Sequence, residues 1–158
     1  MHMPVHVIHG AADGPTLLVC AAIHGDEING AEIIRRLLAH RPCRRLRGTL
    51  VAVPIVNVYG FVTHTRYMPD GRDLNRSFPG REHGSLAGRL AQVFLREIVG
   101  HCTHAVDLHT GSRHRYNYPQ IRANLEDEET LRLAESFGAP VMVHAHSRDG
   151  SLRQVATE

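Results

Sequence analysis

The sequence predicts an α/β fold with a mostly parallel sheet. Short runs of apolar and β-branched residues alternate along the chain with longer stretches whose apolar residues recur at helical spacing. This alternation is typical of parallel strands joined by crossover helices. The chain has 158 residues, of which 42% are hydrophobic and 22% charged, so we expect one globular domain over residues 1–158.

The first third of the chain predicts two strands and a helix. Val5–His9 is a short strand candidate in which apolar and polar residues alternate. Thr16–Ile23 is a continuous apolar run, which is typical of a strand buried on both faces. From Glu27 to His40 the apolar residues recur at helical spacing, and Pro42 is expected to end that helix.

The middle of the chain predicts a strand, a long loop and a helix. Thr49–Val58 is a second buried strand, although Pro54 within it favours a bend or an early end. Asn57–His83 has no clear periodicity, and its aromatic and paired arginine residues indicate a functional loop. Ser85 is expected to cap a helix whose apolar face runs over residues 86–98.

The last third predicts two strands around a helix. His104–His109 is a third strand. Asn124–Phe137 is expected to be a helix, because its first turn is rich in acidic residues that suit the helix dipole. Gly138 is its expected C-cap, and Val141–His144 forms a further strand.

Composition excludes several classes of protein. The net charge of +2 is too balanced to indicate binding to nucleic acid or to an anionic membrane. The longest apolar run, Leu17–Ile23, is too short to span a bilayer, and the first residues do not resemble a secretory signal. Cys20, Cys43 and Cys102 form no CxxC motif, which favours reduced thiols. We therefore expect a cytoplasmic protein with no nucleic-acid or membrane partner.

A candidate metal site lies where two expected strands end. His24 and Glu27 directly follow a buried strand at an expected helix start, where a spacing of three residues places both side chains on one face. Gly25 between them is expected to permit the sharp turn. His109 ends another strand and would reach the same edge of the sheet. Two imidazoles and one carboxylate are the ligand set of a catalytic zinc. Each motif alone is also compatible with ordinary polar residues at strand ends.

Two aspartates are candidates to hold the histidines in place. Asp107 lies two residues before His109, on the same face of the strand, and Asp73 lies in the long loop. Histidine ligands usually donate their second ring N–H to a carboxylate or carbonyl. A purely structural, hydrogen-bonded aspartate is the alternative for Asp107.

The long loop also carries candidate substrate-binding residues. Arg66 and Arg76 offer bidentate donors for carboxylates, and Asn75 adds an amide beside Arg76. Next to a zinc site, such residues would suit a small acidic substrate, with one arginine stabilising the oxyanion. A solvated basic loop is the alternative.

Three motifs together resemble the succinylglutamate desuccinylase/aspartoacylase family of the zinc carboxypeptidase clan. The motifs are His24-Gly-Asp-Glu27, Arg72-Asp-Leu-Asn75-Arg76-x-Phe78 and Asp107-Leu-His109-Thr-Gly111, in that order. The resemblance extends from about Gly14 to the end of the chain. It implies a three-layer α/β/α fold like that of the zinc carboxypeptidases, with a mixed, mostly parallel sheet.

The resemblance also implies roles for the candidate residues. The set of His24, Glu27 and His109 would bind one Zn²⁺ per chain. Asn75 and Arg76 would hold the substrate carboxylate, and Arg66, which precedes their motif in the loop, would polarise the carbonyl. The implied activity is zinc-dependent hydrolysis of the amide bond of N-acyl amino acids. A carboxypeptidase acting on short peptides and a catalytically silent metal-binding module remain as alternatives.

One departure from the family concerns length. Family members are roughly twice as long and carry a general-base glutamate on a later strand, whereas this sequence ends at Glu158. We therefore expect the N-terminal part of a catalytic domain, truncated before the C-terminal strands and weak or inactive by itself. A sheet edge left uncovered in this way would favour self-association into a homo-oligomer.

Overall fold

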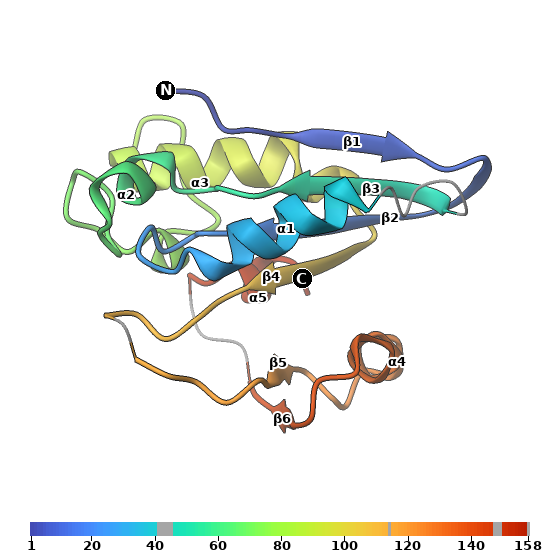
Figure 1. Ribbon diagram of the computed structural model, residues 1–158. Helices are drawn as coiled ribbons and strands as arrows, with labels where there is room; N and C mark the ends of the chain where they lie inside the picture. The colour runs from blue at the N-terminus through green and yellow to red at the C-terminus, as the bar shows by residue number, and fades with distance from the viewer. Residues whose placement is uncertain (41–45, 114, 147–149, 158) are drawn as a thin grey trace.

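The computed structural model describes residues 1–40, 46–113, 115–146 and 150–157. Its strands form one sheet of four strands and a second sheet of two. Figure 1 shows the elements, which follow one another as β1 (His6–His9), β2 (Ala12–Ala21), α1 (Asn29–Ala39), β3 (Arg47–Val53), α2 (Val58–Thr63), η2 (Leu74–Arg76), α3 (Leu86–Glu97), η3 (Val99–His101), β4 (His104–Leu108), β5 (Ile121–Ala123), α4 (Glu128–Phe137), β6 (Met142–His144) and α5 (Leu152–Val155).

The larger sheet has the strand order β1-β3-β2-β4. β2 pairs in parallel with β3 on one side and with β4 on the other, so that Val19 lies opposite both Ala52 and Val106. β1 pairs antiparallel with β3. The predicted mixed, mostly parallel sheet is therefore confirmed.

Helices cover both faces of this sheet, which gives the three layers (Figure 1). Successive side chains of β2 point to opposite faces, and both faces are buried. Val19 and Ala21 pack with Ile34 of α1, whereas Leu18 and Cys20 belong to the cluster that contains Phe94 of α3. Burial of each large apolar side chain contributes about 1.5–3 kcal/mol. This two-sided burial explains the continuous apolar run in the sequence.

The strand bounds differ modestly from expectation. β2 begins at Ala12 rather than at Thr16, because its first residues pair with β3 across a register shift. β3 ends at Val53, directly before Pro54, which confirms the early end that the proline favours. β4 ends at Leu108, so that His109 is the first residue beyond the strand.

The first helix begins later than expected. α1 starts at Asn29, and the Glu27 N–H donates to the His24 carbonyl oxygen (3.1 Å) in a turn before it. The expected helix start at Glu27 was therefore wrong, although the turn still brings the two side chains together. Pro42 and Cys43 lie outside the described residues.

The helix caps follow local hydrogen-bonding rules. The Ser85 hydroxyl accepts the Gly88 N–H at the start of α3 (3.1 Å), as expected. Asp127 caps α4, and Gly138 ends it with a left-handed φ of 74°, which confirms the predicted C-cap. The long loop holds the short helix α2, capped by Asn57, which the sequence pattern did not reveal.

A small second sheet lies apart from the first. β6 confirms the strand expected near Val141–His144, but it pairs in parallel with β5, which we did not expect, and not with the large sheet. In Figure 1 this pair and α4 lie beyond the β4 edge.

Cys20 and Cys102 are free thiols, and burial is the main cause that raises the pKa of the Cys20 thiol well above its usual value.

Within the part of the chain that the structure describes, no helix has the length and apolar character needed to cross a membrane.

Candidate active site

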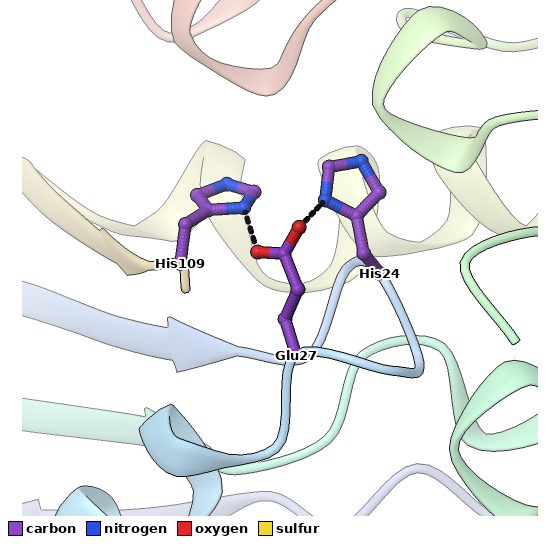
Figure 2. Close-up of side chains that lie close together, drawn as sticks. All are labelled: His24, Glu27 and His109. Carbon is purple, nitrogen blue, oxygen red and sulfur yellow. Dashed lines mark hydrogen bonds and ion pairs between the residues drawn. The ribbon is translucent and has the colours of Figure 1, made fainter. Parts of the chain in front are cut away.

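His24, Glu27 and His109 meet at the carboxyl ends of β2 and β4. Figure 2 shows both imidazoles turned toward the Glu27 carboxylate. Glu27 Oε1 lies 3.0 Å from His24 Nδ1, and Glu27 Oε2 lies 2.9 Å from His109 Nδ1. One potential ligand atom from each residue lies within 4.8 Å of the others. The structure thus brings together the three residues that the sequence singled out as metal ligands.

The turn after β2 places His24 at the edge of the sheet. Ala22 has a left-handed φ of 52°, and its carbonyl oxygen accepts the Asn57 N–H (2.9 Å). The expected reason for Gly25 was wrong, because the left-handed residue of this turn is Ala22. Gly25 instead permits a close approach, since a Cβ there would lie 1.9 Å from the carbonyl carbon of Gly60 in α2.

Each of the two histidines contacts an aspartate through its second ring nitrogen. His24 Nε2 lies 3.1 Å from Asp73 Oδ1, and His109 Nε2 lies 2.7 Å from Asp107 Oδ2. A ring N–H donated to these carboxylates from Nε2 leaves the lone pair of Nδ1 directed toward Glu27. Both aspartates therefore occupy the positions expected of residues that orient metal-binding histidines.

Arg66 reaches the same centre from the long loop. Its guanidinium donates to Asp73 Oδ2 (2.9 Å), Glu27 Oε1 (3.3 Å) and Ser112 Oγ (3.0 Å). With a second bond from Nε to Asp73, four of its five N–H groups are used. One N–H remains for a ligand.

Ser112 is a residue of the centre that the sequence reasoning missed. Its hydroxyl is buried and donates to Glu27 Oε1 (2.8 Å) while it accepts from Arg66. The Thr110 N–H donates to Glu27 Oε2 (2.9 Å). The available signal was position, because Ser112 directly follows the His-Thr-Gly motif. A single serine has no periodicity that would reveal its role.

The charges of the centre shift the pKa values of its groups. Burial disfavours the charged form of His109, but the charge of Asp107 and the hydrogen bonds to Asp107 and Glu27 outweigh it and raise the pKa of His109 to about 10. Burial likewise opposes the charge of His24, yet hydrogen bonds to Asp73 and Glu27 raise its pKa. Against the opposing effect of burial, hydrogen bonds to His109 and His24 hold the pKa of Glu27 well below its usual value.

The donor set fits a divalent cation such as zinc. Two imidazoles and one carboxylate are the ligands that zinc uses in catalytic sites. The carboxylates of Glu27, Asp73 and Asp107 outnumber the Arg66 guanidinium by two when both imidazoles are neutral. A dication would balance that excess of two negative charges.

Asn75 and Arg76 lie next to the centre but have other contacts. The Asn75 N–H donates to Asp73 Oδ1 (2.9 Å), and its side-chain oxygen accepts the Leu152 N–H (2.9 Å). Arg76 is exposed, and its guanidinium donates to the Asn75 carbonyl oxygen. The structure thus shows a hydrogen bond that holds the Asn75 side chain, and it places Arg76 at the surface.

A pocket of about 410 Å³ adjoins the centre. Arg66 and Ser112 belong both to the centre and to the pocket lining. The remaining lining residues are Asp26, His64, Thr65, Tyr67, Arg113 and Arg115.

Proteins of one known family are similar to this chain over most of its length. The succinylglutamate desuccinylase/aspartoacylase catalytic domain matches residues 13–158. The chain belongs to this family. It is 32% identical over 147 residues to N-alpha-acetyl-L-2,4-diaminobutyric acid deacetylase from Halomonas elongata, which covers 89% of this chain and 43% of the deacetylase.

Crystal structures of family members have the same fold. A succinylglutamate desuccinylase from a Silicibacter species gives a TM-score of 0.86 at 28% identity, covering 98% of this chain and 49% of that one. An aspartoacylase family protein from Mesorhizobium loti gives a TM-score of 0.87 at 28% identity, covering 98% and 51%. The chain therefore spans about half the length of these members of the succinylglutamate desuccinylase/aspartoacylase family.

Proposed function

We propose that this protein is a zinc-dependent hydrolase that cleaves the amide bond of N-acyl amino acids. The observation that carries the proposal is the joint arrangement of His24, Glu27 and His109, with a carboxylate behind each imidazole. Membership of the succinylglutamate desuccinylase/aspartoacylase family supports the reaction class. The similarity to a deacetylase of an acetylated amino acid supports the substrate class.

Some residues of the centre would bind the zinc ion, and others would orient those ligands. His24 and His109 would bind one Zn²⁺ through Nδ1, and Glu27 would bind through its carboxylate. When bound, zinc lowers the pKa of a water molecule and polarises the substrate carbonyl. Asp73 and Asp107 would keep the proton of each imidazole on Nε2. The Ser112 hydroxyl and the Thr110 N–H would each hold one carboxylate oxygen of Glu27 in place.

The substrate would be held by the residues around the centre. Arg66 has one N–H to offer and lines the pocket, which suits the developing oxyanion of the substrate carbonyl. Arg76 is exposed and donates to the Asn75 carbonyl oxygen, and its remaining N–H groups would bind a carboxylate with Asn75 beside it. These roles follow the family resemblance.

We also propose that the chain hydrolyses its substrate slowly by itself. The carboxylates that touch the centre are already engaged, Glu27 and Asp73 by three or more donors and Asp107 by His109. None of these three is free to accept a proton from water. A positioned general base typically contributes ~10²–10⁴-fold to the rate.

A hydrolysis panel tests the proposed function. The chain is loaded with one equivalent of zinc and incubated with N-acetyl amino acids, N-succinyl amino acids and dipeptides, and the released amine is measured by mass spectrometry. We expect slow release from N-acyl amino acids that stops when zinc is chelated. The matched control is His104→Ala, since His104 lies on β4 outside the centre. Faster cleavage of dipeptides would indicate a carboxypeptidase, and no zinc-dependent release would contradict the proposal.

A further inference from the structure

The Asp107 carboxylate is held on both of its oxygens. Oδ2 lies 2.7 Å from His109 Nε2, and the Cys20 thiol donates to Oδ1 with a sulfur–oxygen distance of 3.6 Å. We propose that Cys20 is a positioning residue, whose thiol fixes the Asp107 carboxylate and thereby the His109 ring for metal binding. This inference rests on the proposed function, because it concerns a ligand of the proposed zinc centre.

Strand pairing places the thiol beside the carboxylate. Cys20 of β2 lies directly opposite Asp107 in the parallel pairing of β2 with β4. Paired residues of adjacent strands point their side chains to the same face of the sheet. Both residues lie within strands, and His109 follows β4 directly. The contact is therefore set by the backbone hydrogen bonds of the sheet, and a site built on strands is more precise than one built on loops.

The environment of Cys20 leaves hydrogen-bond donation as its polar role. Its side chain is completely buried among the apolar residues of the cluster that contains Phe94. Burial is the largest cause that raises the pKa of this thiol, and the nearby Asp107 charge adds to it, so the sulfur keeps its proton. A buried, protonated thiol is a poor nucleophile, but it can still donate its S–H.

The Oδ1 atom of Asp107 depends on this donor. In the part of the chain that the structure describes, no other group donates to Oδ1. The torsion that rotates an aspartate carboxylate has a broad minimum, so a carboxylate held through one oxygen can turn. With both oxygens held, Oδ2 stays directed at His109 Nε2, and His109 Nδ1 stays directed at Glu27, 2.9 Å away.

The other aspartate of the centre has the same kind of support. Asp73, which contacts His24, also accepts the Asn75 N–H on Oδ1 (2.9 Å). Its Oδ2 accepts from the Arg66 guanidinium (2.9 Å). Each aspartate thus has a donor besides the histidine that it orients. For Asp73 these donors come from the long loop, whereas for Asp107 the donor comes from the core of the sheet.

Zinc affinity, measured by competition with a chromophoric chelator, tests this role. We expect Cys20→Ala to bind zinc about 3–10-fold more weakly, a smaller loss than removal of a whole carboxylate partner causes, because a thiol is a weak donor. Cys20→Ser keeps a donor of similar size and should bind like the wild type. The control is Leu18→Val, which alters the same face of β2 and the same apolar cluster. It should lower the free energy of unfolding without changing zinc affinity.

A double substitution shows whether the thiol acts through Asp107. Cys20→Ala/Asp107→Ala should bind zinc no more weakly than Asp107→Ala, because the donor has then already lost its acceptor. In the metal-free protein, the S–H stretching band that Cys20→Ser removes from the infrared spectrum reports the hydrogen bond directly. We expect Asp107→Ala to shift this band to higher frequency, since a thiol without an acceptor vibrates faster.

Wild-type zinc affinity in Cys20→Ala, additive losses in the double variant, or an S–H band that Asp107→Ala leaves unchanged would each overturn the inference. If Cys20→Ala does not fold, Cys20→Val takes its place, because valine fills the space without a donor. A wild-type chain that binds no zinc would overturn both this role and the proposed function. Zinc binding that depends on Cys20 without any hydrolysis would support this role and defeat the proposed function.

Discussion

Each histidine of the centre is held between two carboxylates. Glu27 faces Nδ1 of both rings, whereas Asp73 and Asp107 each face one Nε2. The site therefore consists of three proposed ligands and two residues that fix the rings. We therefore expect substitutions of the ligands and of the aspartates to have different effects on zinc binding.

The aspartates behind the histidines should control zinc affinity without abolishing it. We expect Asp73→Asn and Asp107→Asn each to weaken zinc binding about 10–100-fold, because an amide holds the ring less firmly and makes the imidazole less basic. Competition with a chromophoric chelator measures the affinity. Asp13→Asn, at an exposed position of β2, is the control and should bind like the wild type. Wild-type affinity in both site variants would show that neither aspartate supports a ligand.

The metal-free centre should give a distinct pH dependence of stability. The pKa of His109 is raised from 6.5 to about 10. Its contribution to the free energy of unfolding is therefore complete below pH 6.5 and is lost as the pH rises through about 10. The pKa of Glu27 is lowered from 4.5, so its contribution is present above pH 4.5 and is lost in acid. We expect the free energy of unfolding to be largest between these limits.

Urea denaturation of the metal-free protein at several pH values measures this dependence. His109→Gln should remove most of the decline toward pH 10 and leave the decline in acid. A wild-type stability that stays level between pH 6 and pH 10 would contradict the assigned ion pairs.

The site also depends on close packing between the turn after β2 and α2. Gly25→Ala would place a methyl group 1.9 Å from the backbone of Gly60, which must then move. We expect a loss of about 1–3 kcal/mol or more in the free energy of unfolding, together with weaker zinc binding. Thermal and urea denaturation measure the first effect. Gly100→Ala is the control, because the nearest atom to its new methyl group lies 3.3 Å away.

Sequence reasoning succeeded where a pattern is local or repeats with a regular period. The apolar run of β2, the capping serine of α3 and the motifs that end β2 and β4 all have such signals. It failed where the determinant is contact between distant segments. Ser112 joins the centre only because β4 lies beside β2, and β5 is a three-residue strand that depends on pairing with β6.

In the molecule as a whole, β4 is an edge strand of the large sheet. It pairs with β2 on one side, and among the described strands none pairs with its other side. Exposed strand edges form hydrogen bonds with other chains. We therefore expect the chain to self-associate as its concentration rises, which multi-angle light scattering would detect. A monomeric mass at every concentration would contradict this prediction.

We propose that His24, Glu27 and His109 bind one zinc ion. Zinc content after equilibrium dialysis, with affinity from chelator competition, tests this binding. We expect one zinc per wild-type chain and per His104→Ala chain, since His104 lies on β4 outside the centre. His109→Ala should hold no zinc under the same conditions, because a two-residue site lacks the ligands of a stable zinc centre. Wild-type stoichiometry and affinity in His109→Ala would contradict the proposed centre.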